Sequence, residues 1–143
     1  MRQRGINALG WVVALGALVL AGCSGSPSPY DYIPIEGTVA YEDGTPLPKG
    51  GFALKFYALD APQVEGMTPR PAQANVDATG KFEYVTSYKH ADGLIPGQHR
   101  VVFFYATDDA GKPLVPREYA MPDSSPLVID TADAPLEITV PKP

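Results

Sequence analysis

Hydrophobic and polar residues alternate along the chain from residue 33 onward, and this period-two pattern is typical of β-strands with one buried face. It is clearest over residues 33–41 and 52–59. Shorter runs predict further strands at 73–76, 81–87, 99–107, 115–119, 127–130 and 136–140. No segment keeps a helical period long enough to predict a helix. About seven short strands separated by turns therefore predict an all-β fold, a seven-stranded antiparallel sandwich.

A hairpin over residues 77–105 lies at the centre of this pattern. Asp77-Ala78-Thr79-Gly80 is a turn sequence, because glycine readily adopts the left-handed backbone that a tight turn needs, and Pro96-Gly97 is a second turn pair. We expect residues 33–141 to fold alone around a core of inward-facing residues. This predicted core consists of Val39, Phe52, Leu54, Phe56, Phe82, Tyr84, Val101, Phe103, Leu136 and Ile138.

The first 23 residues have a different character. Arg2 and Arg4 form a basic start, residues 11–20 are an apolar run, and Leu20-Ala21-Gly22-Cys23 ends the segment. The apolar run is shorter than the about 20 residues of a membrane-spanning helix and has the form of a secretory signal. The last four residues resemble a bacterial lipobox, which implies cleavage before Cys23 and a diacylglyceryl group on its thiol. The alternatives are an ordinary signal peptide, or an uncleaved anchor in which the cysteine is incidental.

This interpretation divides the chain into three parts. They are a lipoprotein signal peptide at 1–22, a lipidated Cys23 with a flexible tether at 23–32, and a β-sandwich domain at 33–143. Serine and proline dominate residues 24–29, as expected for a tether. Ser24 resembles the residue that sends Gram-negative lipoproteins to the outer membrane. The predicted location is therefore the cell envelope, with attachment to the outer membrane through Cys23.

Length and composition restrict the number of domains and the classes of partner and metal site that the chain can have. A length of 143 residues corresponds to about one domain. The 16 acidic residues outnumber the 11 basic ones, and the net charge of -5 argues against nucleic acid as a partner, because phosphate binding needs a basic surface. The single cysteine excludes an internal disulfide and a cysteine-based zinc cluster. We expect a monomer.

Four short phrases carry a resemblance that spans most of the predicted domain. Gly37-Thr38-Val39, Asp43-Gly44-Thr45-Pro46-Leu47, Asp77-Ala78-Thr79-Gly80-Lys81-Phe82 and Pro96-Gly97-Gln98-His99-Arg100-Val101 stand in the order of the transthyretin-like or carboxypeptidase-regulatory-like domain family. The chain is similar to small envelope lipoproteins of this kind in planctomycete-type bacteria. The resemblance implies a prealbumin-like Greek-key sandwich that serves as an accessory or binding module. On this basis the protein is expected not to be an enzyme and to need no cofactor.

The catalytic relatives of this family differ from the chain at their defining residues. Hydroxyisourate hydrolases end in Tyr-Arg-Gly-Ser, whereas this chain ends in Val140-Pro141-Lys142-Pro143. Intradiol dioxygenases use a His-x-His pair, and here the only histidines are His90 and His99. The alternative function is therefore a cryptic hydrolase or metal-dependent enzyme that uses these two histidines. Ser87, Ser124 and Ser125 have no recognisable motif that would supply an activating base.

Two surfaces are candidates for a protein or glycan partner in the envelope. Tyrosines can line a carbohydrate-binding face, although edge tyrosines are also normal in sandwiches; those considered are Tyr30, Tyr32, Tyr57, Tyr88 and Tyr119. If consecutive strands are antiparallel, the loops at 42–51, 77–80, 108–113 and 131–135 gather at the end far from the tether. This predicted acidic tip consists of Glu42, Asp43, Asp77, Asp108, Asp109 and Asp133. It can attract a basic partner or hold Ca²⁺ weakly, or it can consist of solvated turns; no dedicated metal site is predicted.

Overall fold

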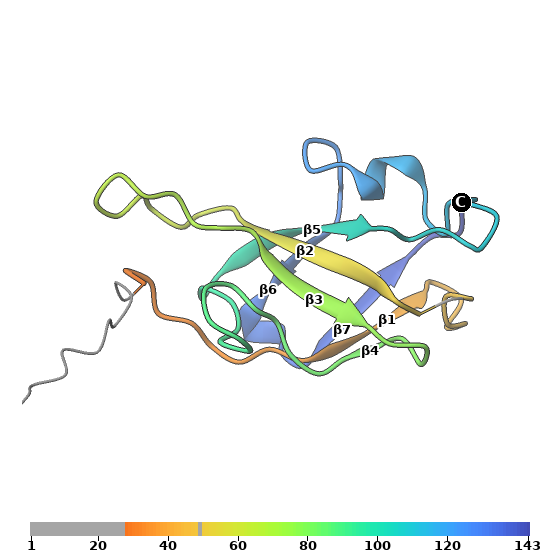
Figure 1. The fold of residues 1–143 in the computed structure, drawn as a ribbon, viewed down its shortest axis with the longest axis horizontal. Coiled ribbons are helices and arrows are strands. Elements are labelled where there is room, and N and C mark those ends of the chain that lie inside the picture. Colours follow the sequence, from red (N-terminus) through yellow and green to blue (C-terminus); the bar gives the residue numbers. More distant parts are fainter. Residues whose placement is uncertain (1–27, 49) are drawn as a thin grey trace, which may run out of the picture.

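The computed structural model of the chain describes residues 28–48 and 50–143. Seven strands and two short 3₁₀ turns make up its regular structure (Figure 1). The strands are β1 (Gly37–Tyr41), β2 (Phe52–Ala58), β3 (Ala72–Val76), β4 (Lys81–Phe82), β5 (Gln98–Phe104), β6 (Val128–Asp130) and β7 (Leu136–Val140). The 3₁₀ turns are η1 (Arg117–Ala120) and η2 (Thr131–Asp133). Among the described residues, no helix has the length and apolar character to cross a membrane.

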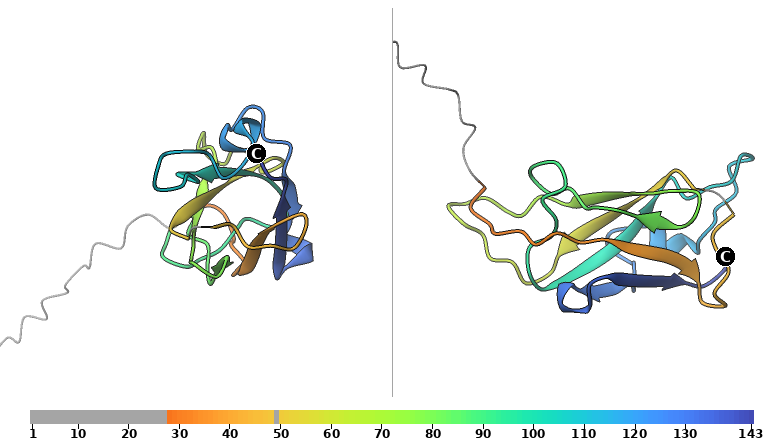
Figure 2. Two further views of the ribbon diagram at one scale, coloured as in Figure 1. Left: turned by 90° about the vertical axis from the view of Figure 1, so that its right-hand side faces the viewer. Right: turned by 90° about the horizontal axis from the view of Figure 1, so that it is seen from below.

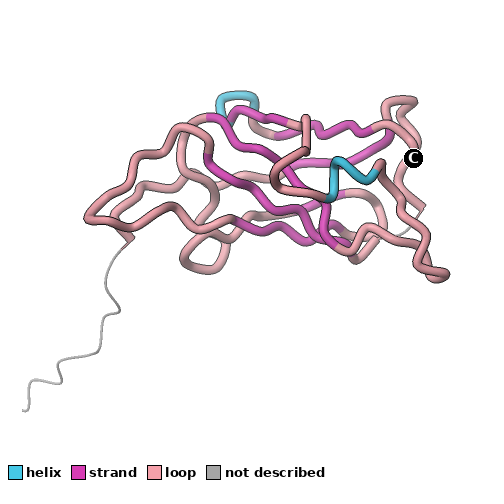
Figure 3. The backbone as a smooth tube through the Cα atoms, turned by 90° about the horizontal axis from the view of Figure 1, so that it is seen from above, coloured by secondary structure: helices cyan, strands magenta, loops and turns pink. Residues whose placement is uncertain are grey.

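The strands form two sheets around one core, which confirms the all-β prediction (Figure 2). One sheet has the order β4-β1-β7 and the other has the order β3-β2-β5-β6. All named pairs are antiparallel except β1 and β7, which pair in parallel from Gly37 with Leu136 to Tyr41 with Val140. Figure 3 shows the strands gathered in the middle of the molecule and longer loops extending at both ends. The chain's first and last strands are therefore neighbours in the same sheet.

The core consists of the inward faces of both sheets. All residues of the predicted core are buried except Tyr84. Phe52 and Phe103 lie with ring centroids 5.8 Å apart within the four-stranded sheet, and Phe56 contacts Phe82 of the other sheet at 6.2 Å. Fully burying each such side chain contributes about 1.5–3 kcal/mol. The contact of Phe56 with Phe82 therefore joins the two sheets, and that of Phe52 with Phe103 packs within one of them.

Tyr84 was predicted to be in the core and is instead 41% exposed. Backbone hydrogen bonds join Gln73 to Thr86 and Asp77 to Lys81, so residues 74–76 face residues 82–85, and the second segment has one residue more than its partner. The extra residue has the effect of a β-bulge, because it interrupts the alternation of faces, and we call it the bulge. Phe82 and Val85 both point inward, and the two residues between them both point outward. The bulge also limits β4 to Lys81–Phe82 instead of the expected 81–87.

The segment expected to be a strand at 115–119 is also different. Residues Arg117–Ala120 form η1, in which the Tyr119 amide donates to the Pro116 carbonyl at 3.0 Å. Proline before a turn of helix-forming residues favours this geometry, because its missing N–H is not needed there. Val115 is buried, so the apolar signal at this position came from the core contact alone.

The direction of β7 corrects the predicted arrangement of loops. Because β7 runs parallel to β1, the loop at 131–135 lies at the end where β1 begins, near the entry of the chain from Ser28. Only the loops at 42–51, 77–80 and 108–113 gather at the far end, beside the carboxyl terminus (Figure 1). Asp133 is therefore not part of the acidic tip.

The segment before β1 is attached to the domain rather than free. Ile33 and Leu94 exchange backbone hydrogen bonds of 2.9 and 3.0 Å. Gly93, at a φ of +102°, allows this approach, because a Cβ there would overlap the carbonyl oxygen of Ile33. The Tyr30 hydroxyl lies 2.7 Å from the Pro62 carbonyl oxygen and 3.0 Å from that of Met67. Residues 28–32, expected to belong to a flexible tether, thus contact the folded domain.

Candidate functional site

The aspartates of the acidic tip serve mainly to build its turns. Asp77 Oδ1 accepts hydrogen bonds from the Thr79 amide (2.8 Å), the Thr79 hydroxyl (2.6 Å) and the Lys81 amide (3.0 Å). Asp108 Oδ1 likewise accepts from the amides of Ala110 and Lys112. The bonds to Asp77 stabilise its ionised form, and the Thr79 hydroxyl, followed by the Lys81 and Thr79 amides, holds the pKa of Asp77 below its usual range. The aspartate of each D-x-T or D-x-A sequence thus accepts hydrogen bonds from the amides of its own turn and stabilises it.

Asp43 accepts hydrogen bonds within its own turn in the same way, and it also forms an ion pair with Lys142 near the carboxyl terminus. Its Oδ1 accepts from the amide and hydroxyl of Thr45, and its Oδ2 lies 2.6 Å from the Lys142 ammonium. The Lys142 hydrogen bond, followed by those of Thr45, lowers the pKa of this carboxyl well below its usual value. Glu42 and Asp109 lie at the same end of the molecule, in the loops at 42–51 and 108–113. Across residues 28–48 and 50–143, no three His, Cys, Asp or Glu side chains form a group that could hold a metal ion.

A groove crosses the edge of the smaller sheet at β4, and no pattern in the sequence predicted it. It comprises three adjoining hollows of about 290, 240 and 160 Å³ that share lining residues. Glu83 and Tyr84 line the first two hollows, Glu36 lines the last two, and Lys81 lines the first and third. We call these hollows the β4 groove. Further lining comes from Pro34, Ile35, Gly37, Thr38, Asn75, Asp77, Pro135, Leu136 and Glu137.

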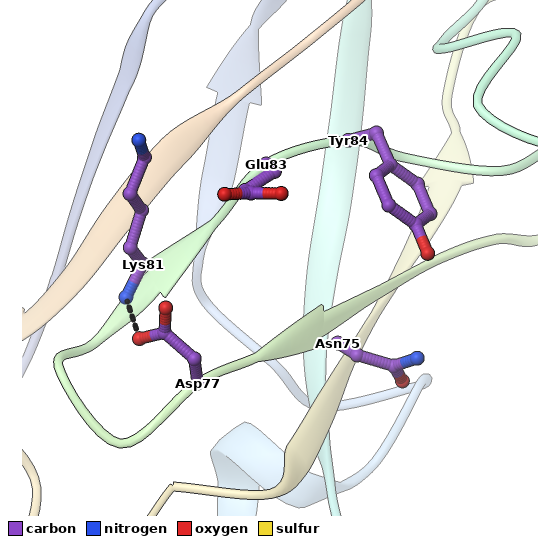
Figure 4. A pocket seen from close by; sticks show the side chains of 5 residues that line it. All are labelled: Asn75, Asp77, Lys81, Glu83 and Tyr84. Atoms are coloured by element: carbon purple, nitrogen blue, oxygen red, sulfur yellow. Dashed lines mark hydrogen bonds between the residues drawn. The ribbon is translucent and has the colours of Figure 1, made fainter.

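The bulge determines which side chains face the β4 groove. In Figure 4, Glu83 and Tyr84 project from the bulged segment and Asn75 from β3, while the dashed line marks the Lys81 amide bonded to Asp77. The ring of His90 stands edge-on to that of Tyr84, with 4.7 Å between centroids and an interplanar angle of 64°. A regular strand would have turned Tyr84 into the core. No residue type in this stretch signals the bulge, so the sequence pattern could not predict the groove.

The two histidines proposed for a catalytic site lie in different environments. His90 is exposed and contacts Tyr84, whereas His99 is only 3% exposed, with Nε2 2.7 Å from the Ile95 carbonyl oxygen. Burial lowers the pKa of His99, although the Ile95 carbonyl opposes this shift. A neutral ring in which Nε2–H donates to Ile95 leaves Nδ1 as a buried acceptor without a partner. His99 is therefore a core residue.

The serine hydroxyls also bond to the backbone. Ser87 donates to the Gly93 carbonyl, Ser124 to the Glu118 carbonyl and Ser125 to the Val101 carbonyl. A serine nucleophile needs a base that accepts its proton. The carbonyl oxygens that these three hydroxyls contact cannot take that role.

Three of the five tyrosines considered for a glycan surface lie together where the chain enters the domain. Tyr30, Tyr32 and Tyr88 line two adjoining hollows of about 50 and 200 Å³. The guanidinium of Arg70 lies 5.4 Å from the centroid of the Tyr88 ring. Tyr57 and Tyr119 line neither hollow; Tyr57 lies on β2 and Tyr119 in η1. We call the first group the entry tyrosines.

No family model, curated protein or solved structure matches this chain. The resemblance to transthyretin-like domains therefore stays a prediction that rests on four short phrases of the sequence. Cys23 and the predicted signal peptide lie outside the described residues, and lipidation of Cys23 stays a prediction as well.

Proposed function

We propose that the protein is a lipid-anchored module of the cell envelope with a non-catalytic binding or structural role. The signal peptide and lipobox support a diacylglyceryl anchor on Cys23, and Ser24 favours the outer membrane. The observation that carries the proposal is that Tyr30, shortly after Cys23, is already in contact with the domain, because its hydroxyl lies 2.7 Å from the Pro62 carbonyl oxygen. A chain spans at most about 3.3–3.6 Å per residue, so the seven steps from Cys23 to Tyr30 reach at most about 25 Å. The domain would then stand directly on the membrane surface.

The arrangement of the domain supports a role directed away from that surface. The chain enters at the end of the entry tyrosines, while the turns of Asp43, Asp77 and Asp108 lie at the opposite end. An anchored domain presents these turns outward and its β4 groove sideways. We further propose that the two sheets follow the Greek-key order of the transthyretin-like family, as the four phrases imply.

A binding role accounts for the side chains better than catalysis does. The interior position of His99 and the carbonyl-bonded hydroxyls of Ser87, Ser124 and Ser125 do not favour catalysis by these residues. The β4 groove, in contrast, collects exposed polar groups around an aromatic ring. We propose a protein or glycan partner in the envelope, and a monomeric state.

Cell fractionation with mass analysis tests this function. The parent chain is expected in the membrane fraction, with an intact mass that corresponds to cleavage before Cys23 plus acyl chains. Two or three acyl chains give stable attachment, since each buried methylene contributes about 0.8 kcal/mol. Cys23→Ser is expected to lose both the mass increase and the membrane association, whereas Ser28→Ala, close by, keeps both. A Cys23→Ser chain of parental size that still sediments with membranes would refute the anchor.

A further inference from the structure

We propose that the β4 groove binds a neutral oligosaccharide, with Tyr84 as the ring on which one sugar unit stacks. This inference rests on the proposed binding role and assigns it a site and a class of ligand. It starts from the bulge between Lys81 and Thr86, which turns a large aromatic side chain out of the core and into the groove. Bulges are frequent beside functional sites because they redirect a single side chain in this way.

The exposed ring is held in place before any ligand arrives. His90 packs edge-on against Tyr84 at 4.7 Å, and Val85, the next residue, is completely buried. The Tyr84 ring therefore has His90 as a packing partner while 41% of the residue remains open to solvent. The apolar C–H face of a pyranose packs on such a ring much as other apolar groups do, and a ring fixed in advance loses little entropy on binding.

Polar groups that can bond to sugar hydroxyls line the same hollows as the Tyr84 ring or the hollow next to them. The side chains of Glu36, Lys81 and Glu83 make no hydrogen bond or ion pair with the described part of the chain. Asn75 keeps its amide N–H₂ available, because the one hydrogen bond that its side chain makes with the described residues is the one that Oδ1 accepts from Gln73 at 3.3 Å. Carboxylates accept from hydroxyl groups, while the ammonium and the amide N–H₂ donate to them. Both halves of a sugar's hydrogen-bonding capacity can therefore be met.

Charge and shape restrict the ligand further. The groove is lined by the carboxylates of Glu36, Asp77, Glu83 and Glu137 and by the single ammonium of Lys81. Anionic polysaccharides and phosphate groups are disfavoured by this excess of negative charge. Each hollow is below the about 300–1,000 Å³ of pockets that enclose a small molecule. Three adjoining shallow hollows, two of them lined by Tyr84, fit consecutive units of a chain lying on the surface.

Isothermal titration of the full chain tests the assignment. The protein is kept in a detergent without a sugar headgroup, and the probes are cellohexaose, maltohexaose, chitohexaose and the anionic oligogalacturonate. At least one neutral hexasaccharide is expected to bind at millimolar concentration or better. Tyr84→Ala is expected to weaken this binding at least about tenfold, a factor that corresponds to 1.4 kcal/mol, and Tyr84→Phe to keep most of it. Tyr105→Ala, which removes a tyrosine that is 84% exposed outside the groove, is the matched control and leaves binding unchanged.

The outcomes separate this inference from the anchor. No binding of any neutral probe, equal binding by the parent and Tyr84→Ala, or preference for oligogalacturonate would each overturn the assignment. These titrations do not depend on acylation, so they can fail while Cys23 is still shown to be the anchor. Unchanged thermal unfolding of Tyr84→Ala shows that the variant is folded, and a variant that unfolds is replaced by Glu83→Gln, for which weaker binding is expected.

Discussion

The hydroxyl of Tyr41, at the end of β1, donates a 2.7 Å hydrogen bond to the carbonyl of Leu114 inside the core. Both residues are buried, at 5% and 6% exposure. The bond links the long connection after β5 to β1 of the smaller sheet. Leu114 is itself held within that connection, because its amide donates to the Ala106 carbonyl at 2.8 Å. A single buried hydroxyl thus joins two parts of the chain that share no strand pairing.

Removing this hydroxyl is expected to destabilise the domain. Tyr41→Phe keeps the ring but leaves the Leu114 carbonyl buried without this donor, which costs about 1–3 kcal/mol. Urea denaturation measures the loss, with Tyr57→Phe as the control, since the partly exposed Tyr57 hydroxyl makes no hydrogen bond in the described part of the chain.

Burial also raises the pKa of Tyr41 above its usual 10.0. Folding is therefore expected to lose stability as the pH rises above 10, and equal stability of Tyr41→Phe and Tyr57→Phe would contradict this account.

Truncation of Phe103 tests the core. Phe103 is 1% exposed and packs against Phe52, so Phe103→Ala is expected to lower the free energy of unfolding by about 3–5 kcal/mol. The measurement uses a fragment of residues 28–143, whose far-ultraviolet spectrum is expected to show β-structure. A variant as stable as the parent, or a spectrum dominated by helix, would be inconsistent with the fold.

Burial of His99 is expected to make the stability of the fold depend on pH in the mildly acidic range. Its pKa in the folded state lies below the ordinary 6.5, so the unfolded chain takes up a proton first as the pH falls. The contribution of neutral His99 is complete above about pH 6.5 and declines as the pH falls from there toward the folded-state value. Denaturation curves measured across this range are expected to show the decline in the parent. His99→Leu, which cannot titrate, should show a flatter profile, and an identical slope in both proteins would rule out this origin.

Tyr105 is expected to be a strained position. It adopts a φ of 57° immediately after β5, and left-handed backbone costs a residue with a Cβ roughly 1–2 kcal/mol. Because the side chain is 84% exposed, little packing offsets this strain. Tyr105→Gly should therefore be more stable than Tyr105→Ala by about 1 kcal/mol, after allowing for the greater freedom of glycine in the unfolded chain. Thermal unfolding of the two variants compares them directly, and a less stable glycine variant would show that the backbone is not strained.

The alternation of residue types was sufficient to predict an all-β fold, most of the strands and most of the core. Phe52, Leu54 and Phe56 lie inward along β2 because an uninterrupted strand has a period of two. The same reasoning failed at Tyr84, where the bulge adds one residue and changes the face of the side chain. The β4 groove depends on that added residue, and nothing in Lys81-Phe82-Glu83-Tyr84-Val85 distinguishes a bulged from a regular strand.

The error for Asp133 has a different origin. Alternating directions were assumed for successive strands, but the chain passes from β6 to the other sheet through η2 and enters β7 parallel to β1. Sequence patterns report which face of a strand is buried and contain no information about its direction. The turn chemistry of Asp43, Asp77 and Asp108 was visible in the sequence, and their hydrogen bonds follow from it.

The pairing of β1 with β7 has a consequence for the order of events during synthesis. Until Leu136–Val140 has been made, the only strand available to β1 in its sheet is the two-residue β4. Contacts between such distant parts of a chain form slowly, because a long loop must close before they give any stabilisation. A nascent chain therefore lacks the main partner of β1 until Leu136–Val140 has been synthesised, and the smaller sheet can be completed only after that strand is available.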